Sequence, residues 1–157
     1  MKIKNKLQTL FKHFFQFIFK ILYGKIIYNT DPTKSKNLEI KSIVNEKIKK
    51  FSNEKYFTYK VYNGRIYTDC VEHVAIIDGN SIVKEASYQQ INGKLEDASK
   101  NIVLEKGTPR LKKKLKGRVL SLAQGASGNN NYFHWMFDIL PKIKIFSQNY
   151  NLNEVDF

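Results

Sequence analysis

Cysteine and histidine, the usual ligands of structural metal sites, are scarce in this chain. Cys70 is the only cysteine, and the three histidines, His13, His73 and His134, stand far apart. A single cysteine excludes a disulfide within the chain, and isolated histidines lack the spacing of zinc ligands. The sequence therefore predicts no zinc cluster, and we expect no cofactor.

Acidic residues are also few, because 14 Asp or Glu accompany 27 Lys or Arg and give a formal net charge of +13. The excess is uneven, since residues 1–50 contain twelve lysines and three acidic residues. A positive surface attracts nucleic acid, anionic lipid and sugar nucleotides alike, so the positive charge alone does not identify the partner. A length of 157 residues with 42% hydrophobic and 13% aromatic residues predicts one folded domain.

A long uncharged hydrophobic run is missing as well. The apolar stretch at residues 10–23 is interrupted by Lys12, His13, Gln16 and Lys20. It is too short and too charged to span a bilayer. It also lacks a small-residue cleavage site, which argues against a secretory signal.

The same stretch instead predicts an amphipathic helix from about residue 3 to 27. A narrow polar stripe recurs every fourth residue, and large apolar residues surround it. The stripe consists of Gln8, Lys12, Gln16 and Lys20. This pattern predicts attachment to an anionic membrane surface at the cytoplasmic side; the alternative is a helix packed on its own domain or on another subunit.

The next part of the chain predicts a linker at 31–35 and a second amphipathic helix from about 37 to 51, so that residues 31–54 connect the first helix to the main domain. From residue 55 the hydrophobic period changes to two, which predicts a meander of short antiparallel strands. Three dipeptides predict the hairpin turns between these strands: Asn63-Gly64, Asp78-Gly79 and Asn92-Gly93. A further strand is predicted at 102–104.

The region after residue 116 predicts a buried strand at 117–123, a loop of turn formers at 125–130 and a helix at about 131–140. Apolar residues cover most of the helix and predict burial, with Trp135 and Ile139 packed against the sheet. The polar residues Asn131, His134 and Asp138 are three and four positions apart and share one face. Pro141 predicts a bend or a restart of the helix, with the proline in its first turn.

His134 and Asp138 allow two interpretations. A carboxylate one turn from a histidine orients the ring and raises its basicity, which is the arrangement of a general base. Alternatively, Asp138 bonds a backbone group and the stripe is structural. His73, in a predicted strand, is interpreted as a packed or edge residue rather than a catalyst.

Gly117-Arg118-Val119, followed by Asn-Tyr-Phe-His-Trp-Met-Phe-Asp-Ile-Leu-Pro-Lys at 131–142, resembles the signature of glycosyltransferase family 61, the capsular polysaccharide biosynthesis proteins. The resemblance covers residues 55–157. It implies an α/β fold, α+β in the part present here, that forms the N-terminal lobe of a two-lobed enzyme. No glycine-rich phosphate loop follows a strand, and a second lobe is expected beyond residue 157, so we expect this truncated chain to be inactive alone.

The resemblance implies an inverting transfer from a nucleotide-sugar donor to a hydroxyl of a glycan acceptor in a capsular or surface polysaccharide. His134 is then the expected base, supported by Asp138, while Asn131 orients the acceptor or caps the helix. Asp138 itself is the alternative base. The corresponding location is the cytoplasm, with residues 1–30 attaching the enzyme peripherally to the inner membrane.

A basic segment, residues 110–118, bears on the rival function classes. It predicts a solvated loop or short helix, and in an enzyme its cations would attract an anionic donor. The absence of interleaved aromatic residues argues against single-stranded nucleic acid. The alternative to an enzyme is a non-catalytic module that binds a membrane surface or a polyanion.

Overall fold

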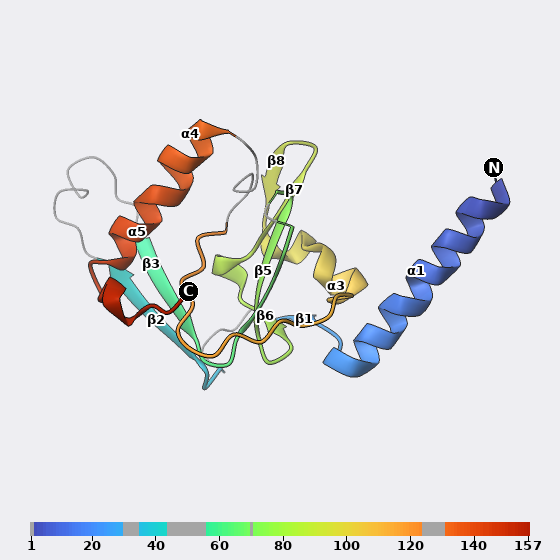
Figure 1. The fold of residues 1–157 in the computed structure, drawn as a ribbon, viewed down its shortest axis with the longest axis horizontal. Helices are drawn as coiled ribbons and strands as arrows, with labels where there is room; N and C mark the ends of the chain where they lie inside the picture. Colours follow the sequence, from blue (N-terminus) through green and yellow to red (C-terminus); the bar gives the residue numbers. More distant parts are fainter. Residues whose placement is uncertain (1, 30–34, 44–55, 70, 124–130) are drawn as a thin grey trace.

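The computed structural model describes residues 2–29, 35–43, 56–69, 71–123 and 131–157. These parts form a mixed α/β structure with a projecting N-terminal helix, a mainly antiparallel six-stranded sheet, a two-stranded sheet and a helical segment near the C-terminus (Figure 1). The predicted fold class, a mixed α/β fold with antiparallel strands, is confirmed. The predicted linker at 31–35 and the loop at 125–130 lie mostly or wholly outside the described residues.

The N-terminal helix is α1, Lys2–Tyr23. The helix predicted for residues 3–27 is therefore confirmed, but it ends earlier than expected. Gly24 adopts a φ of 81°, which favours glycine and ends the helix. A Cβ atom at this position would collide with the side chain of Asn80. The chain then enters strand β1, Ile27–Tyr28, which pairs in parallel with β6.

The large sheet is built around strand β5, His73–Asp78. Its first edge pairs with β4, Arg65–Thr68, and its second edge pairs with β6, Ser81–Ile82, and β7, Tyr88–Ile91. Strand β8, Lys94–Glu96, extends the sheet beyond β7. The core is small and aliphatic, as expected for short strands that alternate between two faces; its buried members are Ile26, Ala75, Ile77, Ile82, Ala98 and Val103.

Two of the three predicted hairpins are confirmed. Asp78-Gly79 lies at the turn between β5 and β6, and Asn92-Gly93 joins β7 to β8. Asn92 and Gly93 have φ angles of 51° and 77°, the positive values that a tight two-residue hairpin turn requires.

The hairpin predicted at Asn63-Gly64 is wrong. Strand β3, Tyr56–Val61, precedes this turn but pairs with β2, Leu38–Ile43, whereas β4 after the turn pairs with β5. The turn therefore links two sheets instead of two neighbouring strands. All six residues of β3 pair with all six of β2, and this longer ladder takes the place of a local hairpin.

The second amphipathic helix predicted for residues 37–51 is wrong where the structure describes it, because strand β2 lies there. Over residues 38–43 the chain is extended, and residues 44–51 lie outside the described parts. The first four residues, Leu-Glu-Ile-Lys, alternate with period two, although the whole stretch also fits a helical period. Pairing with β3 selects the extended form.

Two further predictions of strands are wrong. Residues 102–104 belong to helix α3, Ile102–Lys106, which begins after the N-cap Asn101. The stretch 117–123 has no regular structure, and Val119 within it is half exposed. It lies along the C-terminal residues through a few backbone bonds, such as Leu120 N–H to the Phe157 carbonyl at 3.0 Å, which are too few to form a strand.

The side chain of Asn101 connects α3 to the sheet. Its amide nitrogen donates to the carbonyls of Val74 at 3.0 Å and Tyr88 at 2.7 Å, and its carbonyl oxygen accepts from Val103 N–H at 3.2 Å. The residue is only 2% exposed. One buried side chain thus caps the helix and bonds two neighbouring strands.

We expect Asn101→Ala to lower the free energy of unfolding by roughly 2–4 kcal/mol, because it removes the cap and the donor to two carbonyls. The matched change Asn131→Ala removes an exposed cap with one bond and should cost only about 1 kcal/mol. Urea unfolding of both variants measures the difference. Equal losses would mean that Asn101 contributes no more than a cap.

Candidate functional site

The candidate site lies on one continuous helical segment, residues 132–146, which we call the site helix. It consists of α4, Tyr132–His134, the π-helical turn η4, Trp135–Ile139, and α5, Leu140–Phe146. Asn131 caps its start, because its side chain accepts from Phe133 N–H at 3.0 Å. The capping role expected for Asn131 is therefore present in the structure.

The π turn explains how the helix passes Pro141. In η4 the Leu140 N–H bonds to the Trp135 carbonyl, five residues back. Proline has no N–H and its ring crowds the preceding turn, so a new α-helix begins at Leu140 with Pro141 in its first turn. The predicted restart is confirmed. Single π turns are rare and occur frequently at functional sites.

His134 and Asp138 meet on the site helix. Nδ1 of His134 lies 2.6 Å from Oδ2 of Asp138, and the two side chains are 28% and 26% exposed to solvent. The predicted approach of these side chains is confirmed. With Nδ1–H donating to the carboxylate, Nε2 is the ring nitrogen that can accept a proton. The Phe133 ring stands edge-on to the imidazole at 5.8 Å and restricts its orientation.

A fourth polar residue on this side of the site helix, Lys142, was missed from the sequence. Its Nζ donates to the carbonyls of Leu122 at 3.4 Å and Ala123 at 3.2 Å. Burial lowers the pKa of Lys142 to about 8, although the negative charge of Asp138 acts in the opposite direction. Its spacing of four residues from Asp138 was a signal that the sequence contained, since residues four apart share a helix face.

The side chains of His134, Asp138 and Lys142 lie on the wall of a broad cleft. The cleft is bounded by the site helix, the two sheets and the basic segment, residues 110–118. Its volume is ≈ 3020 Å³, well above the roughly 300–1,000 Å³ of a small-molecule pocket. Among the described residues that line it, twelve are Lys or Arg and five are Asp or Glu. The cleft is therefore large, open and electropositive, which favours an anionic ligand.

The apolar residues of the site helix are more exposed than predicted. Trp135 is 50% and Phe137 65% exposed, and among residues 132–140 only Ile139, at 4%, is buried. The predicted packing of Trp135 against the sheet is thus wrong, whereas burial of Ile139 is confirmed. The helix contacts the two-stranded sheet through α5, which lies beside β3, and α4 lies farther from β3 (Figure 1).

The basic segment is an irregular, exposed stretch, as predicted for a solvated loop. The structure adds that two of its cations cover aromatic rings from other parts of the chain. Arg110 lies 5.4 Å from the centre of the Tyr67 ring, and Lys112 lies 3.9 Å from that of Tyr23. These contacts hold the segment against the sheet and the end of α1.

A second His–Asp pair provides a contrast within the same chain. Nδ1 of His73 lies 3.3 Å from Oδ2 of Asp69, but His73 is only 8% exposed and stacks on Tyr67. Burial lowers the pKa of His73 and outweighs the charge of Asp69, which raises it. Among the described residues, nothing forms a hydrogen bond with its buried Nε2. This histidine is a packed residue, as predicted.

In the described parts of the chain, no three His, Cys, Asp or Glu side chains come together as a metal site would require. None of the helices there is both long and apolar enough to cross a bilayer. No family model, curated protein or solved structure matches the chain.

The lowered pKa of Lys142 predicts a pH-dependent stability. Between pH about 8 and the usual lysine value of 10.5 the unfolded state binds more protons at this residue than the folded state. Stability should therefore rise with pH across this window, because the cost of burying the charge disappears. We expect the unfolding free energy of the wild-type protein to increase relative to that of Lys142→Met as the pH rises between these values.

The control is Lys144→Met, which changes an exposed lysine on the same helix. Because this variant keeps Lys142, its unfolding free energy should show the same rise with pH as that of the wild-type protein. Urea unfolding at a series of pH values measures both. A flat difference between the wild-type protein and Lys142→Met would show that Lys142 titrates as a solvated amine.

Proposed function

We propose that the chain forms the N-terminal lobe of an inverting glycosyltransferase, which moves a sugar from a nucleotide-sugar donor to a hydroxyl of a surface-polysaccharide acceptor. The observation that carries the proposal is the His134–Asp138 pair at 2.6 Å on the wall of an electropositive cleft. The motif at 131–142, which resembles that of glycosyltransferase family 61, supports it.

The pair suits the proton transfer in this reaction. As the acceptor oxygen forms its bond to the anomeric carbon, its proton passes to Nε2 of His134. The bond from that carbon to the donor phosphate breaks on the opposite side, and the nucleotide leaves with the electron pair. Asp138 holds the ring and stabilises the imidazolium. Such positioned proton transfer contributes roughly 100- to 10,000-fold in rate.

The charge of the leaving phosphate requires a second contribution. Lys142 is one turn beyond Asp138 and, with a pKa of about 8, is mainly protonated at neutral pH. Together with the cations of the basic segment it supplies positive charge on the cleft wall. Preplaced charge of this kind stabilises a developing anion. The family resemblance assigns most donor contacts to a second lobe, so we assign turnover to the complete two-lobed enzyme.

The exposure of α1 favours a second function, attachment to an anionic surface. The two functions are compatible, because Tyr23 is the one residue of α1 with a described side chain that lines the cleft, and the helix projects from the body. A peripheral location would bring the enzyme close to a lipid-linked or membrane-associated acceptor.

Substitution of the pair tests the catalytic role. In the complete enzyme, His134→Ala should lower kcat by roughly 100- to 10,000-fold. Its unfolding free energy should change by only about 1 kcal/mol, because the side chain is partly exposed. Nucleotide release from a panel of nucleotide sugars measures turnover. If Asp138 is the base, Asp138→Asn should be the severe variant and His134→Ala the mild one.

The matched control is His73→Ala, which breaks the other His–Asp pair in the core of the sheet. It should lower the melting temperature while the folded fraction keeps its turnover. Parallel losses of melting temperature and turnover in both His134→Ala and Asp138→Asn would refute the catalytic role, because the pair would then be structural.

A further inference from the structure

Helix α1 projects from the body and buries little of its surface (Figure 1). Its outward side is formed by large apolar residues that recur three and four positions apart, the spacing of one helix face. They are Leu7, Leu10, Phe14, Phe17 and Ile21, each 58–74% exposed. Phe11 at 65% and Leu22 at 63% widen this face. We call these seven residues the apolar face.

The body contacts a different side of α1. Tyr23 bonds through its hydroxyl to Lys112 N–H at 3.4 Å, and its backbone carbonyl accepts from Arg65 at 3.3 Å. The Lys20 side chain lies over Gly107, where an added Cβ would come within 3.1 Å of it. In a soluble amphipathic helix the apolar side faces the core. Here the contacts come from the last two turns, where Phe19, Lys20 and Tyr23 are partly buried, whereas the residues of the apolar face stay exposed.

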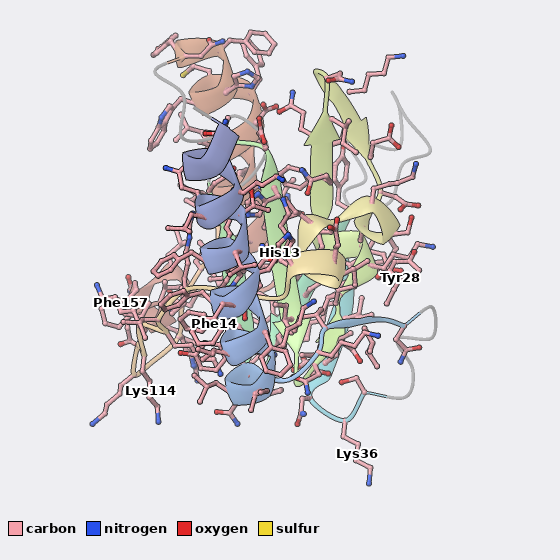
Figure 2. The ribbon with its side chains drawn as sticks, turned by 90° about the vertical axis from the view of Figure 1, so that its right-hand side faces the viewer. His13, Phe14, Tyr28, Lys36, Lys114 and Phe157 are labelled. Atoms are coloured by element: carbon pink, nitrogen blue, oxygen red, sulfur yellow. The ribbon has the colours of Figure 1, made fainter. Side chains whose placement is uncertain are left out.

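Aromatic rings gather on the exposed surface of α1. Phe11 and Phe15 have ring centres 4.6 Å apart, and Phe14 and Phe15 are edge-on at 5.8 Å. Figure 2 views the molecule from this side, with α1 in front of the body and Phe14 and His13 labelled on it. Such bulky apolar side chains at the surface gain stability when they leave water.

The charge of α1 limits what can cover the apolar face. Its 22 residues include five lysines and no Asp or Glu. At its end Lys112, from the exposed basic segment, covers the Tyr23 ring. A second copy of the chain would bring the same lysines together across a two-fold interface, which is unfavourable. The face is also wider than the narrow seam of a two-stranded coiled coil.

An anionic lipid surface fits both the wide apolar face and the positive charge of α1. Its acyl boundary accepts a wide aromatic and aliphatic face, while its headgroups accept the flanking lysines. We propose that α1 is an interfacial anchor that lies in the plane of an anionic membrane, with the apolar face inserted and the basic segment near the headgroups. This function is independent of the proposed transfer reaction.

The test measures sedimentation of the chain with vesicles of phosphatidylcholine alone and of an equal mixture with phosphatidylglycerol. The wild-type chain should bind the mixed vesicles more tightly, and added salt should weaken that binding. Leu10→Glu should lower the partition coefficient by roughly ten- to hundredfold, because a leucine no longer enters the acyl boundary. Leu10 is 74% exposed, so the fold should be preserved, as checked by circular dichroism.

The matched control is Leu95→Glu, which places the same charge on a leucine of β8 that is 70% exposed. It should bind as the wild-type chain does, and so should His134→Ala, which separates this proposal from the catalytic one. Equal binding by Leu10→Glu and Leu95→Glu would overturn the anchor, as would absence of binding by the wild-type chain. So would a dimer in vesicle-free solution that Leu10→Glu dissociates, since a second copy would then cover the face.

Discussion

The pairing of strand β5 on both edges is the constraint on which the rest of the structure depends. One edge carries β4, and the other carries β6 and β7, so β5 is the strand around which the large sheet assembles. Two of its buried residues, Ala75 and Ile77, belong to the small core. The parallel pairing of β1 with β6 then determines where α1 leaves the body, and the bonds of Asn101 determine where α3 sits.

The candidate site combines a local and a tertiary contribution. The helical spacing of His134, Asp138 and Lys142 is local, and it aligns an imidazole, a carboxylate and an amine along one face. The tertiary contribution is the surrounding cleft, where the basic segment and the two sheets place positive charge around that face. The Asp69–His73 pair has the same spacing of four residues, yet its histidine is packed in the sheet. Environment rather than spacing therefore separates a candidate base from a core residue.

The proposed anchor and the proposed transfer explain different parts of the molecule. The cleft accounts for the polar face of the site helix and for the cations around it, whereas α1 has its apolar face directed away from the body. Both depend on positive charge, which the chain carries in excess. Under the two proposals, one positive field attracts both the lipid headgroups and an anionic donor.

The sequence by itself determined the features that are set within a few residues. The α1 helix, the turns at Asp78-Gly79 and Asn92-Gly93, the cap at Asn131 and the approach of His134 to Asp138 follow from periodicity, turn chemistry and helical spacing. Only the tertiary structure decided the partner of β3, the extended form of β2, the irregular path of residues 117–123 and the exposure of Trp135. These depend on contacts between residues distant in the chain, and short apolar segments fit more than one local structure until such contacts select one.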